Sequence, residues 1–376
     1  MPPFASTAHA GVAFAPVLWA SDERRAAFDH WLNPLAARAG LAPQTLRVAA
    51  ADASFRRFLR IDRTPTEGDA ATSRIVMDAP PTQESCRSFV QIAKLMQQAG
   101  LNVPQVLDWN EADGFMLLTD LGARTLMDAL DPADAERAQP LYAGAVDALI
   151  DWQLASRPGV LPVYDQALLQ RELALFPDWY IERHKGVVID AAMRATLDQT
   201  FATIVQHNLA APSVYIHRDF MPRNLMLPAG ADPRVGVLDF QDAVYGPISY
   251  DIACLMRDAF LSWDEEFVLD VTVRYWQRAK KVGLLGANSA SGWGDDFGEF
   301  YRAVEWMGLQ RHLKVAGIFA RLTLRDGKPK YLADASRFIG YIRATAGRYR
   351  ELTPLLRLID KLEGSAAATG FAFGRM

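Results

Sequence analysis

Short runs in which apolar and polar residues alternate dominate the first third of the chain, a pattern that predicts β-strands. The runs LRVAA, FRRFLRID and SRIVMDAP are separated by turn-forming stretches, and VPQVLDWNEADGFMLLTDLG has the pattern of a strand, a turn and a second strand. Apolar residues at steps of three and four predict one helix over 21–40, between Ser21 as N-cap and Gly40 as stop, and another over 84–99. Up to about residue 122 we therefore expect a mainly β lobe.

From residue 123 onward the apolar residues recur at helical spacing. Helices are predicted over residues 133–155, 166–208, 251–282, 295–324 and 332–361. One short apolar strand, RVGVLDF, lies among them. We expect four parts: a flexible N-terminal extension at 1–20, an N-lobe at 21–122, a C-lobe at 123–364 and a C-terminal tail at 365–376.

Composition adds limits to this picture. The chain has 376 residues, a formal net charge of −4, 50% apolar and 22% charged residues, which favours a globular protein and argues against a nucleic-acid partner. Two cysteines, Cys86 and Cys254, are too few for a disulfide framework and are expected to be buried thiols. The sequence shows neither a signal-peptide pattern nor a run of eighteen apolar residues. We expect a cytoplasmic monomer that binds neither nucleic acid nor a membrane.

Polar residues concentrate in IHRDFMPRNLML, directly after an apolar run. Asp219 and Asn224 stand five positions apart, and Asp239 follows Asp219 by twenty positions at the end of an apolar strand. Phosphoryl transfer needs one carboxylate to orient the attacking hydroxyl, and a side-chain oxygen and a second carboxylate to hold Mg²⁺ against the phosphates. The spacing therefore favours Asp219 as the catalytic residue and Asn224 and Asp239 as metal ligands. The alternative is a polar turn with no catalytic role.

Two neighbours of Asp219 have separate interpretations. His217 is predicted to brace the loop by hydrogen bonding to the backbone. Arg218 either pairs with a nearby acid or faces solvent, and we do not assign it to catalysis.

These residues resemble the aminoglycoside phosphotransferase family of small-molecule kinases. The resemblance covers about residues 46–260 and includes GPISYDIACLMRD, where Asp251 matches an aspartate that ties back to the catalytic loop. It implies an α+β, two-lobed, protein-kinase-like fold. A small, mainly β N-lobe would bind the nucleotide, and a larger, mainly helical C-lobe would carry the catalytic residues and bind the acceptor.

Within that family the chain resembles the anomeric kinases of cell-wall sugars, which phosphorylate the C1 hydroxyl of N-acetylmuramate and N-acetylglucosamine. The segments that carry this narrower resemblance are ADASFRRFLR, IVMDAPP, LDFQDAVYGPISYD and QRHLKVAGIFARL. It implies ATP and Mg²⁺ as cofactors, an amino sugar as the acceptor and a role in peptidoglycan recycling.

The sequence differs from protein kinases in three motifs. It has no G-x-G-x-x-G-x-V loop, no V-A-I-K strand and no A-P-E segment, and LDFQDAVYGPISYDIA leaves no room for an activation loop. Asp296-Phe297-Gly298 spells DFG, but it lies far downstream of the catalytic loop, where Asp295 or Asp296 is expected to cap a helix. The acceptor is therefore expected to be a small molecule rather than a peptide.

The nucleotide site is expected in the N-lobe, where one kinase residue is missing. SRIVMDAP has Met77 or Asp78 at the position where kinases place the lysine that grips the phosphates. The candidates for nucleotide contacts are Ser54, Arg56, Arg57, Leu118 and Asp120, the last two through hinge backbone groups. The same pattern also fits arginines that are solvated on a strand, and a plain edge strand in place of the hinge.

Two helical segments are candidates for the acceptor side. Arg311, Lys314, Arg321 and Arg325 fall on one helical face, which is either a solvated stripe or a surface for an anionic acceptor such as the lactyl carboxylate of N-acetylmuramate. The residues predicted to contact the sugar are Glu172, Trp179, Tyr180, Arg311 and His312. Two alternatives remain: a kinase of aminoglycosides, choline-like amines or other small alcohols, and a nucleotide-binding pseudokinase that regulates a partner.

Overall fold

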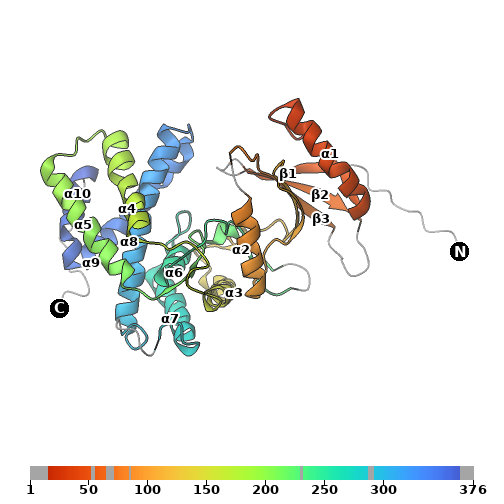
Figure 1. Cartoon of the computed structure of the whole chain (residues 1–376). Coiled ribbons are helices and arrows are strands. Elements are labelled where there is room, and N and C mark those ends of the chain that lie inside the picture. Colours follow the sequence, from red (N-terminus) through yellow and green to blue (C-terminus); the bar gives the residue numbers. More distant parts are fainter. Residues whose placement is uncertain are drawn as a thin grey trace. The chain divides into compact units, whose positions relative to one another are not determined.

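The chain folds into two compact units, shown in Figure 1. The N-terminal unit comprises Met1–Gln97 and Val103–Ala123, and the C-terminal unit comprises Gln98–Asn102 and Arg124–Met376. The computed structural model describes residues 16–51, 56–64, 72–83, 86–228, 232–286 and 292–364. The predicted tail at 365–376, residues 1–15 of the predicted extension and Ser54 lie outside the described residues.

The N-terminal unit is built on an antiparallel five-stranded sheet with the strand order β1-β2-β3-β5-β4. Its strands are β1 (Leu41–Ala51), β2 (Arg57–Arg63), β3 (Ser73–Asp78), β4 (Val106–Asn110) and β5 (Phe115–Thr119). Gly114 in the turn between β4 and β5 has a φ of 71°, and a Cβ there would lie 2.0 Å from the carbonyl oxygen of Ala79. The mainly β N-terminal part that alternation predicted is thus present.

The register of the strands shows which side chains lie on each face of this sheet, because residues paired across strands point to the same side. Val76 pairs with Leu117, and both belong to a core that includes apolar residues of helix α1. Met77 pairs with Met116 on the opposite face, and Figure 1 draws helix α2 on that side. The bounds of the two helices are Asp22–Ala39 for α1 and Arg87–Gln98 for α2.

Helix ends that the sequence predicted are present. Ser21 caps α1 by accepting a hydrogen bond from the backbone N–H of Arg24, and Gly40 ends the helix with a φ of 64°. Asp296 caps the long helix α8, so the downstream DFG sequence is a helix start. Each cap satisfies backbone groups that a helix leaves without an internal partner.

The C-terminal unit is mainly helical, as predicted. Its helices are α3 (Ala135–Leu154), α4 (Gln166–Leu175), the π-helical segment η2 (Phe176–His184), α5 (Ala191–Leu209), α6 (Ser249–Met256), α7 (Glu265–Lys281), α8 (Phe297–Leu324), α9 (Ala335–Arg348) and α10 (Thr353–Glu363). Its described residues form two short pairs of strands, β6 (Ser213–Ile216) with β9 (Val244–Pro247) and β7 (Leu225–Met226) with β8 (Gly236–Val237). Helix α8 packs against α4, α5, α6, α7 and α9 and forms the centre of the unit.

Three of the predicted long helices are divided. The helix expected at 166–208 is broken at Gly186, which has a φ of 66°, and Asp190 caps α5. The helix expected at 251–282 is broken between α6 and α7, where Asp264 caps the second helix, and α9 and α10 replace the helix expected at 332–361. In the first two cases an aspartate N-cap starts the new helix, which apolar spacing alone does not reveal. Helix α10 begins after Leu352, with a proline in its first turn and no side-chain cap.

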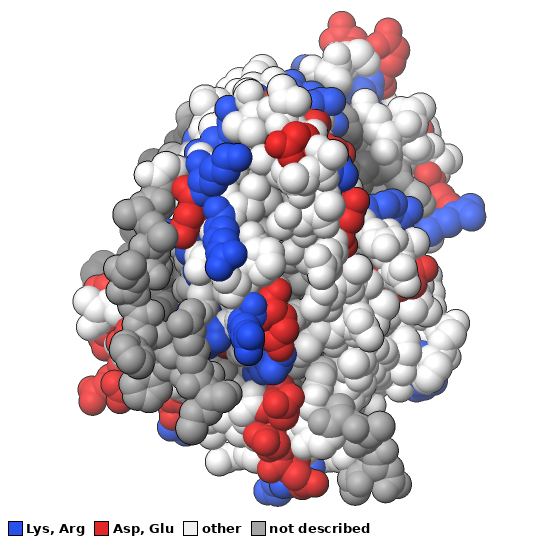
Figure 2. Space-filling model, turned by 90° about the vertical axis from the view of Figure 1, so that its left-hand side faces the viewer, with Lys and Arg blue, Asp and Glu red and all other residues white. Residues whose placement is uncertain are grey.

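Charged residues of both signs are mixed on the surface. Figure 2 shows Lys and Arg interspersed with Asp and Glu on the described part of the face that it draws. Some charges are paired between elements, such as Arg302 of α8 with Glu351 at 2.6 Å. No helix among the described residues is both long and apolar enough to cross a membrane.

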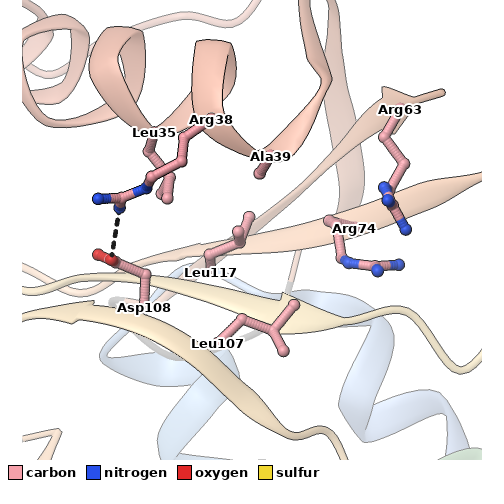
Figure 3. Close-up of a pocket in the computed structure, with 8 residues that line it drawn as sticks. All are labelled: Leu35, Arg38, Ala39, Arg63, Arg74, Leu107, Asp108 and Leu117. Carbon is pink, nitrogen blue, oxygen red and sulfur yellow. Dashed lines mark hydrogen bonds and ion pairs between the residues drawn. The ribbon is translucent and has the colours of Figure 1, made fainter. Parts of the chain in front are cut away.

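A pocket of about 380 Å³ opens in the N-terminal unit on the α1 side of the sheet, as Figure 3 shows. Arg38 of α1 reaches toward Asp108 of β4, with 3.5 Å between their charged atoms, and Arg74 of β3 lines another part of the pocket. None of the predicted site residues lines it. Leu117, which lines the pocket, belongs to the α1 face of the sheet, so the pocket lies on the opposite face from Met77.

Candidate active site

Asp219 lies in a loop whose backbone is held by helix α6. Asp251 in the first turn of α6 is fully buried, and its carboxylate accepts hydrogen bonds from the backbone N–H groups of His217 (2.6 Å) and Arg218 (3.0 Å). Burial raises the pKa of Asp251, and His217 and the two backbone donors offset part of the rise. These hydrogen bonds fix the two residues immediately before Asp219.

The buried imidazole of His217 joins two segments of the site. Its Nε2 lies 2.9 Å from the carbonyl oxygen of Leu238, and its Nδ1 accepts a hydrogen bond from the backbone N–H of Asp219 at 3.2 Å. Burial lowers the pKa of His217. A neutral ring with its proton on Nε2 satisfies both contacts. Through this ring, the loop of Asp219 is tied to the residue that precedes Asp239.

Asn224 and Asp239 lie together beside the backbone of Asp219. The Nδ2 of Asn224 donates to the carbonyl oxygen of Asp219 at 2.8 Å and lies 3.4 Å from Oδ2 of Asp239. Gln241 donates to the other carboxylate oxygen of Asp239 at 2.9 Å. Because the amide nitrogen of Asn224 faces the protein, its Oδ1 is left to accept a ligand. Carboxylate and amide oxygens are the ligands that Mg²⁺ takes from proteins, so this donor set fits that ion.

The backbone at this site is strained at two positions. Arg218 has a φ of 79° and Asp239 a φ of 64°, and among the described residues these are the two non-glycine residues with a positive φ. Such conformations are unfavourable for residues with a Cβ and persist only where the surroundings impose them. Arg218 directly precedes Asp219, and Asp239 is itself a predicted metal ligand.

Arg218 pairs with an acid, one of the two possibilities that the sequence left open. Its guanidinium lies 2.6 Å from Oε1 of Glu172 in α4, and Nζ of Lys314 in α8 lies 3.0 Å from the same oxygen. The hydroxyl of Tyr164 donates to Oε2. Local sequence carries no signal for the pair, because 46 positions separate Glu172 from Arg218.

The charge of Glu172 is stabilised by these partners. Burial by itself would raise the pKa of Glu172, but Lys314 and Arg218 outweigh burial and hold the pKa below its usual value. Only 5% of the residue is exposed. Glu172 was predicted to contact the sugar; the structure engages both of its oxygens inside the protein.

Arg311 is a buried cation in the neighbourhood of Asp219. It is 5% exposed, its guanidinium carbon lies 5.4 Å from the centre of the Tyr250 ring, and its Nε has no hydrogen-bond partner among the described atoms. Burial by itself would lower the pKa of Arg311, whereas Cys254, Tyr250 and Asp219 raise it above the usual value. Asp219, Asp251 and Asp258 all interact electrostatically with this guanidinium, so Arg311 is a positive charge among the acidic residues of the site.

The other predicted acceptor residues lie elsewhere in the C-terminal unit. The hydroxyl of Tyr180 donates to Glu363 at 2.8 Å, and only 1% of Tyr180 is exposed. His312 is buried and stacks on Tyr341, with 4.7 Å between ring centres, and burial lowers its pKa to about 3. Trp179 is partly exposed, and the guanidinium of Arg183 lies 3.9 Å above its ring. Their contacts with a sugar stay predictions.

Met77 and Asp78, the two candidates for the position of the missing lysine, point to opposite faces of the sheet. Met77 is buried on the α2 side of the sheet, and Asp78 is buried on the α1 side. The carboxylate of Asp78 lies 3.1 Å from Nε of Arg24 and 3.0 Å from Nε of Arg57. Arg57, a candidate for nucleotide contact, is thus engaged on the α1 side, and neither Met77 nor Asp78 supplies a cation.

The predicted hinge lies at the end of β5. Leu118 pairs with strands on both sides, opposite Ile75 of β3 and Val106 of β4, and is therefore in the interior of the sheet. The side chain of Asp120 accepts hydrogen bonds from Arg60 at 2.6 Å and from the hydroxyl of Ser73 at 2.7 Å. Burial by itself would raise the pKa of Asp120, but these donors lower it.

Arg56, the remaining described candidate for nucleotide contact, lies directly before β2 and is partly buried. Its contact with a nucleotide stays a prediction.

A family model and two named relatives match most of the chain. Residues 45–284 match the model of a family described as the phosphotransferase enzyme family. The chain is 47% identical to the N-acetylmuramate/N-acetylglucosamine kinase of Neisseria meningitidis over 330 residues, which cover 87% of this chain and 94% of the relative. It is 46% identical to the protein of the same name from Pseudomonas aeruginosa, over 87% of this chain and 91% of the relative.

Solved structures share the fold at low sequence identity. An ADP-bound aminoglycoside phosphotransferase APH(2'')-Ib matches with a TM-score of 0.54 and 14% identity, over 83% of this chain and 97% of its own. An ethanolamine kinase of Plasmodium vivax matches with a TM-score of 0.56 and 11% identity, over 89% and 88%.

Proposed function

Because the chain belongs to the phosphotransferase enzyme family, we propose that it transfers the γ-phosphoryl group of ATP to the C1 hydroxyl of N-acetylmuramate or N-acetylglucosamine. The relatives from Neisseria meningitidis and Pseudomonas aeruginosa carry the names of kinases for these two sugars. Both sugars occur in peptidoglycan, so the reaction belongs to cell-wall recycling, and its need for ATP assigns it to the cytoplasm.

One observation carries the proposal: Asp239 lies beside Asn224, and the loop that carries Asp219 and Asn224 has its backbone held by buried hydrogen bonds. Asn224 contacts both the carbonyl oxygen of Asp219 and the carboxylate of Asp239. Phosphoryl transfer depends mainly on positioning and charge stabilisation, and a loop held by buried hydrogen bonds supplies positioning. We infer that Asn224 Oδ1 and the carboxylate of Asp239 hold Mg²⁺, which when bound neutralises charge on the phosphates.

Asp219 is assigned the role of orienting the acceptor hydroxyl and accepting its proton. The anomeric hydroxyl of a free sugar belongs to a hemiacetal and is more acidic than an ordinary alcohol, so modest base assistance is enough. Arg311 is the residue we assign to the lactyl carboxylate of N-acetylmuramate, since this cation interacts with Asp219 and its Nε has no hydrogen-bond partner among the described atoms. A polycationic aminoglycoside does not complement such a residue.

The test is a panel of acceptors with detection of released ADP. We expect turnover with N-acetylmuramate and N-acetylglucosamine, no turnover with 1-O-methyl-N-acetylglucosamine, and loss of turnover in Asp219→Asn. Turnover with an aminoglycoside or choline in place of the sugars would assign the chain to another acceptor, and full sugar-dependent turnover in Asp219→Asn would remove Asp219 from the mechanism.

A second candidate function is a nucleotide-binding pseudokinase, and one observation favours it. The position of the kinase lysine holds Met77 and Asp78, and the latter is engaged by two arginines. Binding of ATP without turnover on any acceptor of the panel would favour this function over the kinase.

A further inference from the structure

We propose that Glu172 is a positioning residue that holds the catalytic loop in its reactive conformation. Its carboxylate is a permanent negative charge that pairs with Arg218 of the loop. The inference rests on the proposed kinase function. It gives Glu172 a role that acts through Arg218 rather than by contact with the sugar.

The contacts of Glu172 come from three separate parts of the C-terminal unit. Arg218 of the catalytic loop and Lys314 of α8 both contact Oε1, at 2.6 and 3.0 Å, and Tyr164 from the segment before α4 donates to Oε2. The side chains of Arg218 and Lys314 are 19% and 13% exposed, and that of Glu172 is 6% exposed. Charge-assisted hydrogen bonds of this kind are the stronger ones, particularly where water is largely excluded. We call these four residues the Glu172 anchor.

Arg218 is the point at which this anchor acts on Asp219. Its φ of 79° is unfavourable for a residue with a side chain. Asp251 holds its backbone N–H, and Glu172 holds its guanidinium. If the side chain is released, the backbone can relax toward a negative φ, and such a rotation moves the next residue, Asp219.

Loss of the Glu172 charge also changes the electrostatics beside Asp219. Arg218 and Lys314 both interact electrostatically with Glu172 and with Asp219. If Glu172 is neutral, we expect Arg218 and Lys314 to interact more strongly with the carboxylate of Asp219. An ion pair between Arg218 and Asp219 would then compete with the acceptor hydroxyl for the Asp219 carboxylate.

Helices α4 and α8 support the anchor rigidly. Gln310 of α8 donates to the carbonyl oxygen of Leu169 in α4 at 3.0 Å. At Gly317 the two helices approach so closely that a Cβ would lie 2.3 Å from the carbonyl oxygen of Leu175. Other kinases order their active loops by pairing arginine with a phosphate that a second enzyme adds. Here a carboxylate on a rigidly packed helix provides the negative charge, so the loop needs no modification to be active.

The experiment compares Glu172→Gln with a matched control, Glu305→Gln. Glu305 is also buried, at 6% exposure, and its carboxylate is likewise contacted by an arginine and a tyrosine, Arg348 and Tyr349. We expect Glu172→Gln to lower kcat for N-acetylmuramate by about 10- to 100-fold, the size of effect that misplacement of a catalytic group produces. The KM values for sugar and ATP should stay at wild-type values. Glu305→Gln should lose thermal stability and keep its kcat.

A second variant covers the case in which Glu172→Gln does not fold. Arg218→Met removes the link to the loop and leaves Glu172 paired with Lys314 and Tyr164. We expect it to show the same loss of kcat, and the double variant to be no slower than either single variant, because both substitutions break one interaction. Arg218→Gly should also be slow, although glycine removes the strain at φ 79°.

The outcomes separate the two proposals. Wild-type kcat in Glu172→Gln, a raised KM for the sugar at unchanged kcat, or additive losses in the double variant would each overturn the positioning role. A wild-type enzyme with no activity on either sugar would instead overturn the proposed function.

Discussion

Replacement of Asp251 by asparagine should loosen the catalytic loop at a cost that the structure allows us to work out. The carboxylate of Asp251 accepts two backbone hydrogen bonds, from His217 at 2.6 Å and from Arg218 at 3.0 Å, in a fully buried position. Asparagine has nearly the same shape but one acceptor oxygen, so its NH₂ group must face one of the two N–H donors. A buried donor left without a partner costs about 1–3 kcal/mol.

Asp258→Asn is the matched control for this variant. Asp258 lies seven positions after Asp251 and is 3% exposed, but one of its carboxylate oxygens has no hydrogen-bond partner among the described atoms. Asparagine has an oxygen that can keep the hydrogen bond that Asp258 accepts from the backbone N–H of Phe260 at 3.3 Å. The control should therefore lose no stability at pH 7.5.

The assay is urea unfolding at pH 7.5, together with kcat on the sugar. Asp251→Asn should lower the free energy of unfolding by about 1–3 kcal/mol and lower kcat, because the residues before Asp219 lose one of their two tethers. Equal unfolding free energies for wild type and Asp251→Asn would refute the reasoning. So would a control that loses as much stability as the variant.

Three further predictions concern stability. Burial raises the pKa of Asp258 to about 6, above its unfolded value, so the folded state binds the proton more tightly and the contribution of Asp258 to stability should fall by about 3 kcal/mol as pH rises from about 4 to 6. Asp258→Asn should therefore gain about that much stability relative to wild type across this window in urea titrations, and a constant difference would contradict the assignment. Gly317→Ala should lower the free energy of unfolding by about 1–3 kcal/mol or more, because its Cβ would meet the carbonyl oxygen of Leu175 and push α4 away from α8. The control Gly340→Ala in α9, where nothing lies within 4 Å of the added Cβ, should raise the melting temperature. Equal changes of melting temperature in the two variants would show that the contact with Leu175 does not limit stability. Asp78→Ala leaves two arginines without their shared carboxylate and should cost about 3 kcal/mol in urea unfolding, the low end for a buried pair because the arginine side chains are 15% and 34% exposed; an unchanged unfolding midpoint would contradict this.

Much of the fold follows from local patterns in the sequence. Alternation located the strands of the N-terminal sheet, and the cap residues Ser21, Gly40 and Asp296 marked helix ends because capping depends on neighbours within three or four residues. Apolar spacing does not reveal the divisions at Asp190 and Asp264, since an aspartate within a helical apolar pattern also fits an exposed position of one continuous helix. The family resemblance drawn from the catalytic loop is confirmed by the match to residues 45–284.

The candidate site was predictable only where its residues are close in sequence. Asp219, Asn224 and Asp239 lie within 21 positions and are brought together by one loop and two short strands. The pairing of Glu172 with Arg218 depends on the packing of α4 against the loop, which no spacing encodes. Aromatic residues at helical spacing are ambiguous for the same reason, and Tyr180 is in the core.

The most direct test of the proposed function is phosphorus NMR of the product formed from ATP and N-acetylmuramate. We predict one phosphomonoester signal whose coupling to the sugar protons assigns the phosphate to C1, and no product from 1-O-methyl-N-acetylglucosamine, in which the C1 oxygen is blocked. A phosphate on any other hydroxyl, or phosphorylation of the blocked sugar, would contradict it.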